Sequence, residues 1–550
     1  MSDSQNSLKS PSAQPVVQDA VLSADELELR AQGHKGELPR QFSTLSTLAI
    51  AFTLTSAWIG YSATFPYPLL AGGGPYVFWG LIVATVACCI ITAGLAELSS
   101  AYPSTGGQYH FAFMVSSPRT RASVAFGMGW LSVIAYCLFT ASATIVNAQI
   151  VAAIAGFWHE DFVATQWQVY LMYVLFQALA TAVVTLFPRQ LPKTEIVFFF
   201  ISVSGCIVFF ITVLSASDTK QPAKVVFTEV VNVTGWSDGV SFILGVGTCM
   251  YAYIATDGAS HLAEELPNPG KGIPRTMMLS LGISAVSVIP WTLAFMFSTN
   301  DLEAVGNSTF PILEVYQQAL NNRAGATFLA VWLLVVYFGS IISATAATGR
   351  LTWAFARDNG LPFSPTLAKI HPTLQMPVNA TCAASVFVAV YGAIYVGSTT
   401  AFNSFISMSI LSLNVTYAIP QGIVLFRGRD KILPSTRHFN LGKILGPFCN
   451  IFCVLWVSLY TVLFCLPTFL PAEVESMNYV SVVVAGVVLI IVIMWFSGKN
   501  KTFLGPIINM ELLEAAQVQH GEDAENQSKA EVSKKISEHQ RRASQEKPVM

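Results

Sequence analysis

An acidic residue interrupts a long apolar run near the middle of the sequence. The stretch "YAYIATDGASHLAEELPNPGKGIPR", Tyr251 to Arg275, begins like a membrane segment and meets Asp257 and Gly258 before the apolar run is finished. A helix that breaks inside lipid leaves backbone N–H and C=O groups without partners, which is costly. The freed helix ends carry partial charges that suit a small polar or zwitterionic solute. The stretch therefore predicts a helix that opens at Thr256, Asp257 and Gly258 to bind a substrate.

A second interpretation of the same residues stays open. Gly258 could mark a simple kink, with Asp257 acting as the N-cap of the short helix "GASHLAEEL" that follows. Spacing alone does not decide between a binding site and a capped kink.

A comparable irregularity lies in the first apolar segment. The stretch "TSAWIGYSATFPYP", Thr55 to Pro68, contains small residues, Gly60, Pro66 and Pro68, all of which weaken helical continuity. If five spans form one repeat, the first and sixth spans are counterparts. Secondary transporters often place the substrate between two helices interrupted in this way.

The elements that carry these residues belong to a membrane protein. Hydrophobic residues make up 53% of the chain and charged residues only 11%, and the mean hydropathy is +0.56. A formal net charge of -2 gives no concentrated basic face, so no nucleic-acid partner is expected. His, Asp and Cys do not gather within the membrane segments, so the sequence predicts no enzyme, no cofactor and no metal site.

Apolar segments of about 20 residues, long enough to cross the hydrocarbon core, recur along the chain. They predict an all-α polytopic membrane protein with about 12 transmembrane helices. The predicted spans are 45–70, 76–97, 123–155, 167–187, 195–215, 238–257, 276–298, 325–349, 378–397, 401–426, 445–466 and 478–497.

Basic residues indicate the orientation of these spans. Because Lys and Arg accumulate on the cytoplasmic side, their presence in alternate loops predicts that both termini are cytoplasmic. The sequons that begin at Asn232 and Asn307 then fall in outer loops and are predicted glycosylation sites. Residues 1–42 and 501–550 are polar and predicted to be disordered tails. The transmembrane domain is predicted to cover 43–500.

The motif "ELSSAYPSTGGQYHF", Glu97 to Phe111, together with "DGASHLAEELPNPGKGIPR", resembles the amino acid, polyamine and organocation transporter superfamily, in particular its fungal amino acid/choline branch. The resemblance implies a five-plus-five inverted-repeat fold of the LeuT type with two extra helices. Repeat one would cover 45–215, repeat two 238–426, and the extra helices 445–497. It further implies alternating access and a substrate site between the first and sixth helices.

The resemblance also suggests roles for individual residues. Asp257 matches the acidic position in the sixth-helix break, and Tyr251 matches an aromatic residue that closes over substrate in relatives. In the first helix, amino acid carriers usually have Gly-small-Gly-Ile where this chain has Ser56, Ala57, Trp58 and Ile59, followed by Gly60. Trp58 could stack on an organic cation such as choline, an interaction of about 0.5–2 kcal/mol, or it could simply pack between helices.

Three further expectations concern the transport cycle. Glu97, Glu264 and Glu265 are expected to form an inner gate with basic loop residues such as Arg350 or Arg357. Asp257 is the only acid placed deep within a predicted span, which makes it a candidate proton carrier. His110 and His261 are expected to make ordinary hydrogen bonds.

The expected function is a proton-coupled permease of small amines such as choline, amino acids or γ-aminobutyrate. Alternatives are a carrier that imports or exports a cationic metabolite such as an alkaloid, and a sensor of the same fold that does not transport. The plasma membrane is the expected location, with the vacuolar membrane as an alternative.

Overall fold

The structure is a computed structural model that describes residues 31, 38–159, 161–473 and 477–508. Within these residues it consists of helices and connecting loops. Twelve helical segments are long and apolar enough to cross a membrane, so the prediction of an all-α polytopic fold is confirmed. Most of the two predicted tails lies outside the described residues.

The spans follow the predicted order, with boundaries that agree within about two helical turns. They are α2 (Thr44–Thr55) with α3 (Ala57–Thr64), α5 (Gly74–Ala101), α7 (Arg121–Trp158), α8 (Gln166–Leu186), α9 (Leu191–Ala216), α11 (Asp238–Cys249) with the 3-10 helices η2 (Met250–Tyr253) and η3 (Gly258–Glu265), α12 (Pro269–Ser298), α15 (Arg323–Arg357), α17 (Val378–Gly392) with α18 (Ile394–Gly397), α19 (Thr399–Arg427), α21 (Gly442–Leu463) and α22 (Val480–Met494).

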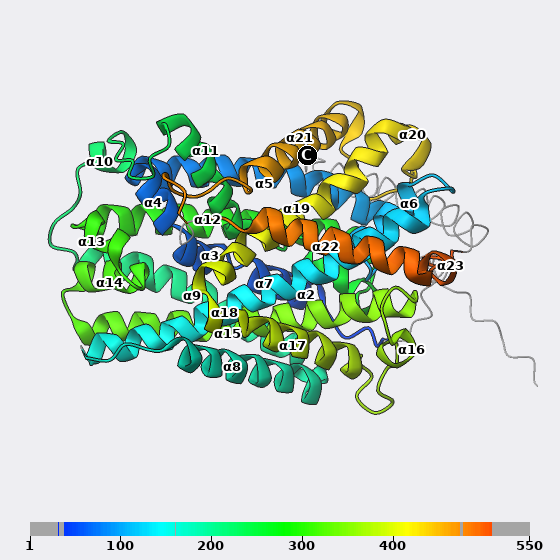
Figure 1. Cartoon of the computed structure of the whole chain (residues 1–550), viewed down its shortest axis with the longest axis horizontal. Coiled ribbons are helices and arrows are strands. Elements are labelled where there is room, and N and C mark those ends of the chain that lie inside the picture. Colours follow the sequence, from blue (N-terminus) through cyan, green and yellow to red (C-terminus); the bar gives the residue numbers. More distant parts are fainter. Residues whose placement is uncertain (1–30, 32–37, 160, 474–476, 509–550) are drawn as a thin grey trace, which may run out of the picture.

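Shorter helices mark the two ends of the bundle (Figure 1). At one end lie α6 (Gln108–Val115), α16 (Ser364–Leu367), α20 (Arg429–Ile432) and α23 (Asn500–Thr502), and this is called the basic end below. At the other, the outer end, lie α10 (Ala223–Phe227), α13 (Leu302–Asn307) and α14 (Pro311–Leu320). The remaining short elements are α4 (Pro66–Gly72), η1 (Pro188–Gln190) and the π-helical segment η4 (Trp495–Lys499).

The two interrupted spans lie in the interior of the bundle. In the most apolar part of the first span 83% of the residues are buried, and in the sixth 67%, against 6% for the twelfth. Apolar side chains on the outer helices can face lipid without penalty, whereas an opened backbone must be enclosed by protein or water. The two interrupted spans are buried within the bundle, so their opened backbone is enclosed by protein.

The first span breaks at Ser56. This residue has a left-handed backbone (φ 35°, ψ 57°) and separates α2 from α3. Its amide still donates to the Phe52 carbonyl at 2.7 Å, and its hydroxyl donates to the Thr53 carbonyl at 2.5 Å. Gly60 lies within α3 and Pro66 begins α4, so both follow the break, which lies at the first residue of the segment 56–59 indicated by the resemblance.

The sixth span breaks where the sequence predicted. Helix α11 tightens into η2, and the chain then leaves helical geometry until η3 starts at Gly258. Ala255 has a left-handed backbone with φ 57°. Gly258 stands where the two broken spans meet, because a Cβ atom there would lie 2.0 Å from Cδ2 of Leu54 in α2. Only a residue without a side chain allows this approach.

Candidate functional site

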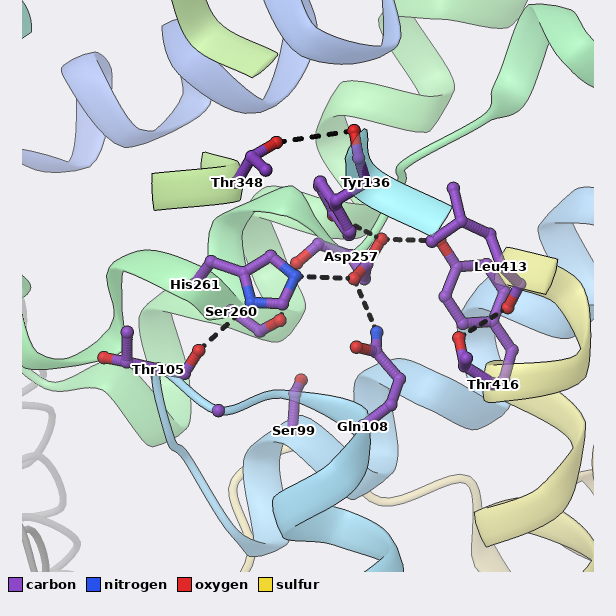
Figure 2. A network of polar contacts seen from close by, with 12 residues as sticks. Ser99, Thr105, Gln108, Tyr136, Asp257, Ser260, His261, Thr348, Leu413 and Thr416 are labelled. Carbon is purple, nitrogen blue, oxygen red and sulfur yellow. Dashed lines mark hydrogen bonds and ion pairs between the residues drawn. The ribbon is translucent and has the colours of Figure 1, made fainter. Parts of the chain in front are cut away.

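Asp257 is the centre of a buried polar network (Figure 2). Its side chain is fully buried. Oδ1 accepts hydrogen bonds from the hydroxyls of Tyr136 at 2.8 Å and Tyr417 at 2.5 Å. Oδ2 accepts from Nε2 of Gln108 at 2.5 Å and lies 3.0 Å from Nε2 of His261. The carboxylate thus has four partners, which satisfies a buried acid well.

The four partners come from four different elements. Gln108 begins α6, Tyr136 lies in α7, Tyr417 in α19, and His261 one turn after Asp257 in η3. Asp257 therefore ties the short second half of the sixth span to three other helices.

Both ring nitrogens of His261 face hydrogen-bond acceptors. Nε2 faces the Asp257 carboxylate, and Nδ1 lies 3.1 Å from the carbonyl oxygen of Thr105. A neutral imidazole has only one N–H, so both contacts can be made only if the Asp257–His261 pair holds one further proton. Both contacts are hydrogen bonds, as expected for His261, and one of them is to the acid.

The capped-kink interpretation of Asp257 is wrong in its detail. Its side chain makes no hydrogen bond to the backbone amides of η3. Instead, the amide and hydroxyl of Ser260 both donate to the backbone carbonyl of Asp257, at 2.7 and 2.6 Å. The carboxylate is thereby left to the four partners described above.

Tyr251 joins the two interrupted spans on the side of the break nearer the outer end. Its ring packs against Gly60, since a Cβ added to Gly60 would lie 3.6 Å from the ring. Its hydroxyl hydrogen bonds with Oγ of Ser142 in α7 at 2.6 Å. The neighbouring carbonyl of Ile59 accepts from the hydroxyl of Tyr337 in α15 at 2.6 Å. Ile59, Gly60 and Tyr251 are thus brought together.

Thr256 faces another direction. Its hydroxyl lies 3.1 Å from that of Thr92 in α5. Both line a small cavity between α5, the opened segment and α19, together with Asn414, and this cavity has room for no more than a water molecule. The described conformation is therefore tightly closed around this part of the break.

Trp58 points away from Tyr251 and Asp257. Its Nε1 donates to Oγ of Ser202 in α9 at 3.0 Å. Its ring packs at 5.2 Å from Phe209 and 5.9 Å from Trp291, measured between centroids. The indole is fully buried. Of the two roles considered for Trp58, this geometry favours packing between helices. Ser56 and Ala57 are buried beside it at the break.

Two ion pairs hold η3 to α15 on the basic side of the break. Arg350 donates through Nε and Nη2 to both oxygens of Glu265, the second at 3.1 Å, and Gln41 adds a bond of 2.7 Å. Arg357 donates to both oxygens of Glu264, at 2.9 and 3.1 Å. The contact of Arg350 is bidentate, through two nitrogens, which makes it strong and directional, whereas Arg357 reaches both oxygens of Glu264 from Nη1. The structure thus pairs Glu264 and Glu265 with the two arginines proposed from the sequence.

Glu97 forms a separate cluster. It accepts from Nη2 of Arg429 at 2.5 Å and from Nε of Arg437 at 3.0 Å. The backbone amide of Leu441 also donates to it at 3.2 Å. Glu97 therefore anchors the segment between α19 and α21, and its basic partners are Arg429 and Arg437 in place of the Arg350 and Arg357 given as examples from the sequence.

One expectation about acids is wrong. Asp257 is not the only acid within a span, because Glu195 lies in the second turn of α9 and is fully buried. The predicted span began at residue 195, whereas the structure extends the membrane segment back to Pro188. Because the predicted boundary placed Glu195 at the first residue of the span, the sequence did not identify it as a buried acid.

The two sequons differ in their surroundings. Asn307 and Thr309 are exposed. Asn232 is engaged in the fold, because its Nδ2 donates to the carbonyl of Trp236 at 2.8 Å and its Oδ1 accepts from the hydroxyl of Thr234 at 2.7 Å. Among the described residues, no group of three or more His, Cys, Asp and Glu side chains could hold a metal ion, and all nine cysteines are free.

These features define a polytopic membrane protein of the carrier class, with two interrupted central helices and paired charges beside the breaks. The chain belongs to the amino acid permease family, whose model matches residues 42–493. It is a member of a family of transporters and not of enzymes.

Several relatives match nearly the whole chain. The choline transporter of Saccharomyces cerevisiae is 32% identical over 493 residues, which cover 88% of this chain and 87% of the relative. The transmembrane transporter swnT of Metarhizium robertsii is 28% identical, with 89% and 97% covered. The amino-acid permease BAT1 of Arabidopsis thaliana is also 28% identical, with 89% and 98% covered.

Proposed function

We propose that this protein is a secondary carrier of small amines, with choline, amino acids and γ-aminobutyrate as the substrate classes to test first. The observation that carries the proposal is the meeting of two interrupted spans in the buried centre of the bundle, where Tyr251 of the sixth packs on Gly60 of the first. Opened backbone at this depth is tolerated where it serves a binding site or a cavity. Similarity to a choline transporter supports the substrate class.

The substrate site would use the backbone of both breaks. In this proposal Ser56, Ala57, Ile59 and Gly60 supply carbonyl and amide groups from the first span, and Thr256, Asp257 and Gly258 supply them from the sixth. Tyr251 would close over the bound amine. Trp58 would support α3 from behind through α9 and α12, because its ring is already occupied by protein partners.

Asn147 is an additional candidate for this site. It is fully buried in α7, and neither its Oδ1 nor its Nδ2 has a hydrogen-bond partner among the described residues. It lies seven residues after Thr140 and eleven after Tyr136, so helical spacing places the three side chains on one face of α7. Buried amides are rarely left without partners, and a polar ligand would satisfy both atoms.

The transport cycle would be alternating access within residues 43–500, with repeats at 45–215 and 238–426 and the extra helices at 445–497. We place the basic end toward the cytoplasm, since Lys and Arg concentrate there. The pairs of Glu264 with Arg357 and of Glu265 with Arg350 would then close the cytoplasmic path. The plasma membrane is the proposed location.

A second candidate is a carrier of a cationic metabolite such as an alkaloid. It is favoured by similarity to a protein named swainsonine transporter in Arthroderma benhamiae, which is 28% identical and covered over 97% of its length. The same residues would serve import or export.

The test is uptake of labelled choline by cells that express the protein, with unlabelled γ-aminobutyrate, polyamines and neutral amino acids as competitors. Surface expression is quantified in parallel. Saturable choline uptake that is lost in Tyr251→Ala at unchanged surface level supports the proposal. Absence of uptake of choline and of every competitor, at normal surface level, argues for a sensor.

A further inference from the structure

Glu195 is a buried acid that the proposed substrate site does not use. Its side chain in α9 is fully buried. Oε2 accepts a hydrogen bond of 2.7 Å from Oγ of Ser343 in α15. Oε1 has no hydrogen-bond partner among the described residues, and no described cation pairs with either oxygen. Asp257, by contrast, has four partners.

An ionised carboxylate in this position would be expensive. Removing a charge from water costs several kcal/mol unless a counter-charge and hydrogen bonds replace the hydration. One hydroxyl is a weak replacement, particularly because the Ser343 hydroxyl also lies 3.1 Å from the Gly339 carbonyl. A neutral carboxyl group, which carries its own proton, avoids most of this cost.

The one nearby counter-charge is already engaged. Arg350 follows Ser343 by seven residues on α15, so the two side chains lie on the same helix face about 10 Å apart along the axis. Its guanidinium is bonded to Glu265 in η3. Arg350 therefore stands between two acids and pairs with only one of them in the described conformation.

No other charge competes for Glu195 from the helices packed on α9. Helix α2 has no titratable side chain between Thr44 and Thr55. In α12 the charged residues Lys271 and Arg275 lie in its first two turns, at the same end as Glu195, but both are exposed. Arg189 of η1 and Lys193 of α9 are exposed as well. In α14, Tyr316 faces Phe209, near the other end of α9.

We propose that Glu195 is a proton-binding site coupled to the gate formed by Arg350 and Glu265. With the gate closed, Glu195 carries the proton. When η3 moves away and Glu265 releases Arg350, the guanidinium turns to Glu195, the O–H bond of the carboxyl group breaks, and water at the opened basic end takes the proton. This deepens the proposed carrier function, on which it rests, by naming the group that would link protons to the gate.

The direction in which gate opening changes with pH follows from this exchange of partners by Arg350. Low pH at the basic end keeps Glu195 neutral and leaves Arg350 with Glu265, so the gate stays closed. Rising pH favours the ionised carboxylate, its pairing with Arg350 and an open gate. For release of one proton, the ratio of open to closed protein changes by up to about tenfold per pH unit.

Hydrogen–deuterium exchange of the purified full-length protein in lipid nanodiscs tests this without any transported solute. The readout is exchange in peptides that contain α2 and η3, divided by the intrinsic rate at each pH between about pH 5 and about pH 8.5. In the unmodified protein, corrected exchange should rise with pH. In Glu195→Gln, which imitates the protonated acid, it should stay low and independent of pH.

Two further variants make the result specific. Ser343→Ala removes the one donor that stabilises the carboxylate, so the increase of corrected exchange should shift to higher pH with the same slope. This variant tests the proposal even if Glu195→Gln fails to fold. Glu314→Gln removes one negative charge from α14 and should behave like the unmodified protein. A pH-dependent rise that persists in Glu195→Gln, or an unshifted rise in Ser343→Ala, overturns the proton site.

Choline uptake separates this proposal from the proposed function. If the exchange results are as expected and no amine is carried, the proton site stands and the carrier function fails. If choline is carried and corrected exchange is independent of pH, the carrier function stands and the proton site fails.

Discussion

The indole nitrogen of Trp58 donates a hydrogen bond to the hydroxyl of Ser202, and this contact fixes α3 against α9. Trp291 of α12 completes the packing around the ring. A tryptophan held in this way supports the first-span break mechanically, whereas a tryptophan that stacks on a substrate cation would leave one face of the ring accessible.

We therefore expect Trp58→Ala to lower stability and not substrate affinity. Truncation of a buried aromatic ring of this kind costs about 3–5 kcal/mol, because the cavity it leaves is only partly refilled. Ser202→Ala, which removes only the hydrogen bond, should cost about 1 kcal/mol. Thermal unfolding in detergent measures both. A KM for choline that rises in Trp58→Ala while the unfolding midpoint is unchanged would restore the stacking role.

Gly258→Ala should disturb the meeting of the two broken spans. The added methyl group would lie 2.0 Å from Cδ2 of Leu54, so the leucine must move. Overpacking of this kind costs about 1–3 kcal/mol. The matched control is Gly60→Ala, whose new Cβ would find its nearest neighbour at 3.6 Å, an ordinary contact. Adding Leu54→Ala to Gly258→Ala should recover part of the loss in unfolding midpoint; equal midpoints for the two glycine variants would contradict the steric argument.

The pair of Arg350 with Glu265 should be far more sensitive than a surface pair. At a pH low enough to keep Glu195 protonated, Glu265→Gln leaves a buried guanidinium without a counter-ion, which typically costs about 3–5 kcal/mol. Glu229→Gln is the control, because Glu229 lies 3.5 Å from the exposed Lys224, and such surface pairs contribute about 1 kcal/mol or less. Unfolding midpoints of the two variants measure the difference. Similar midpoints would show that the gate pair is not held in the closed form in solution.

Asp257→Asn tests whether this acid is a structural centre. In Asp257→Asn one accepting oxygen becomes an NH2 group, which can only donate. If this group takes the place of Oδ2, the Gln108 amide must turn over and Nε2 of His261 must accept, so the network has to be rearranged. We expect a lower unfolding midpoint and loss of choline uptake, whereas Tyr417→Phe, which removes one donor, should be milder. A stable Asp257→Asn that transports but has lost its pH dependence would instead identify Asp257 as the proton carrier.

Hydropathy was sufficient to predict the spans, and the helix-breaking residues within them were sufficient to predict the sixth-span break. Each span is a local property of about 20 residues, and Asp257 with Gly258 is a local interruption. The first break was indicated at 56–59 only by the resemblance, because the left-handed backbone of Ser56 does not follow from its residue type, while Gly60 remains helical.

The partners of Asp257 could not be predicted from the sequence in the same way. Gln108, Tyr136 and Tyr417 lie 149, 121 and 160 positions away, and only the tertiary packing of α6, α7 and α19 brings them together. The pairing of His261 with Asp257 is predictable from the sequence, because a spacing of four residues places two side chains on one helix face. Glu195 is predictable from the sequence as a buried acid if the fifth span begins at Pro188, where the membrane segment begins in the structure.

Glycosylation tests the orientation of the bundle and the difference between the two sequons. Both sequons lie toward the outer end, but only Asn307 presents an exposed side chain. Attachment of a sugar to Nδ2 of Asn232 would replace one of its two N–H groups, so the bond to Trp236 or the bond to Asp238 would be lost. We expect Asn307→Gln to abolish the glycosidase-sensitive shift on a gel, and Asn232→Gln to leave it unchanged. If the mobility shift remains in Asn307→Gln and disappears in Asn232→Gln, Asn232 is modified before its loop folds. If glycosidase causes no mobility shift of the unmodified protein, this support for a cytoplasmic basic end is removed.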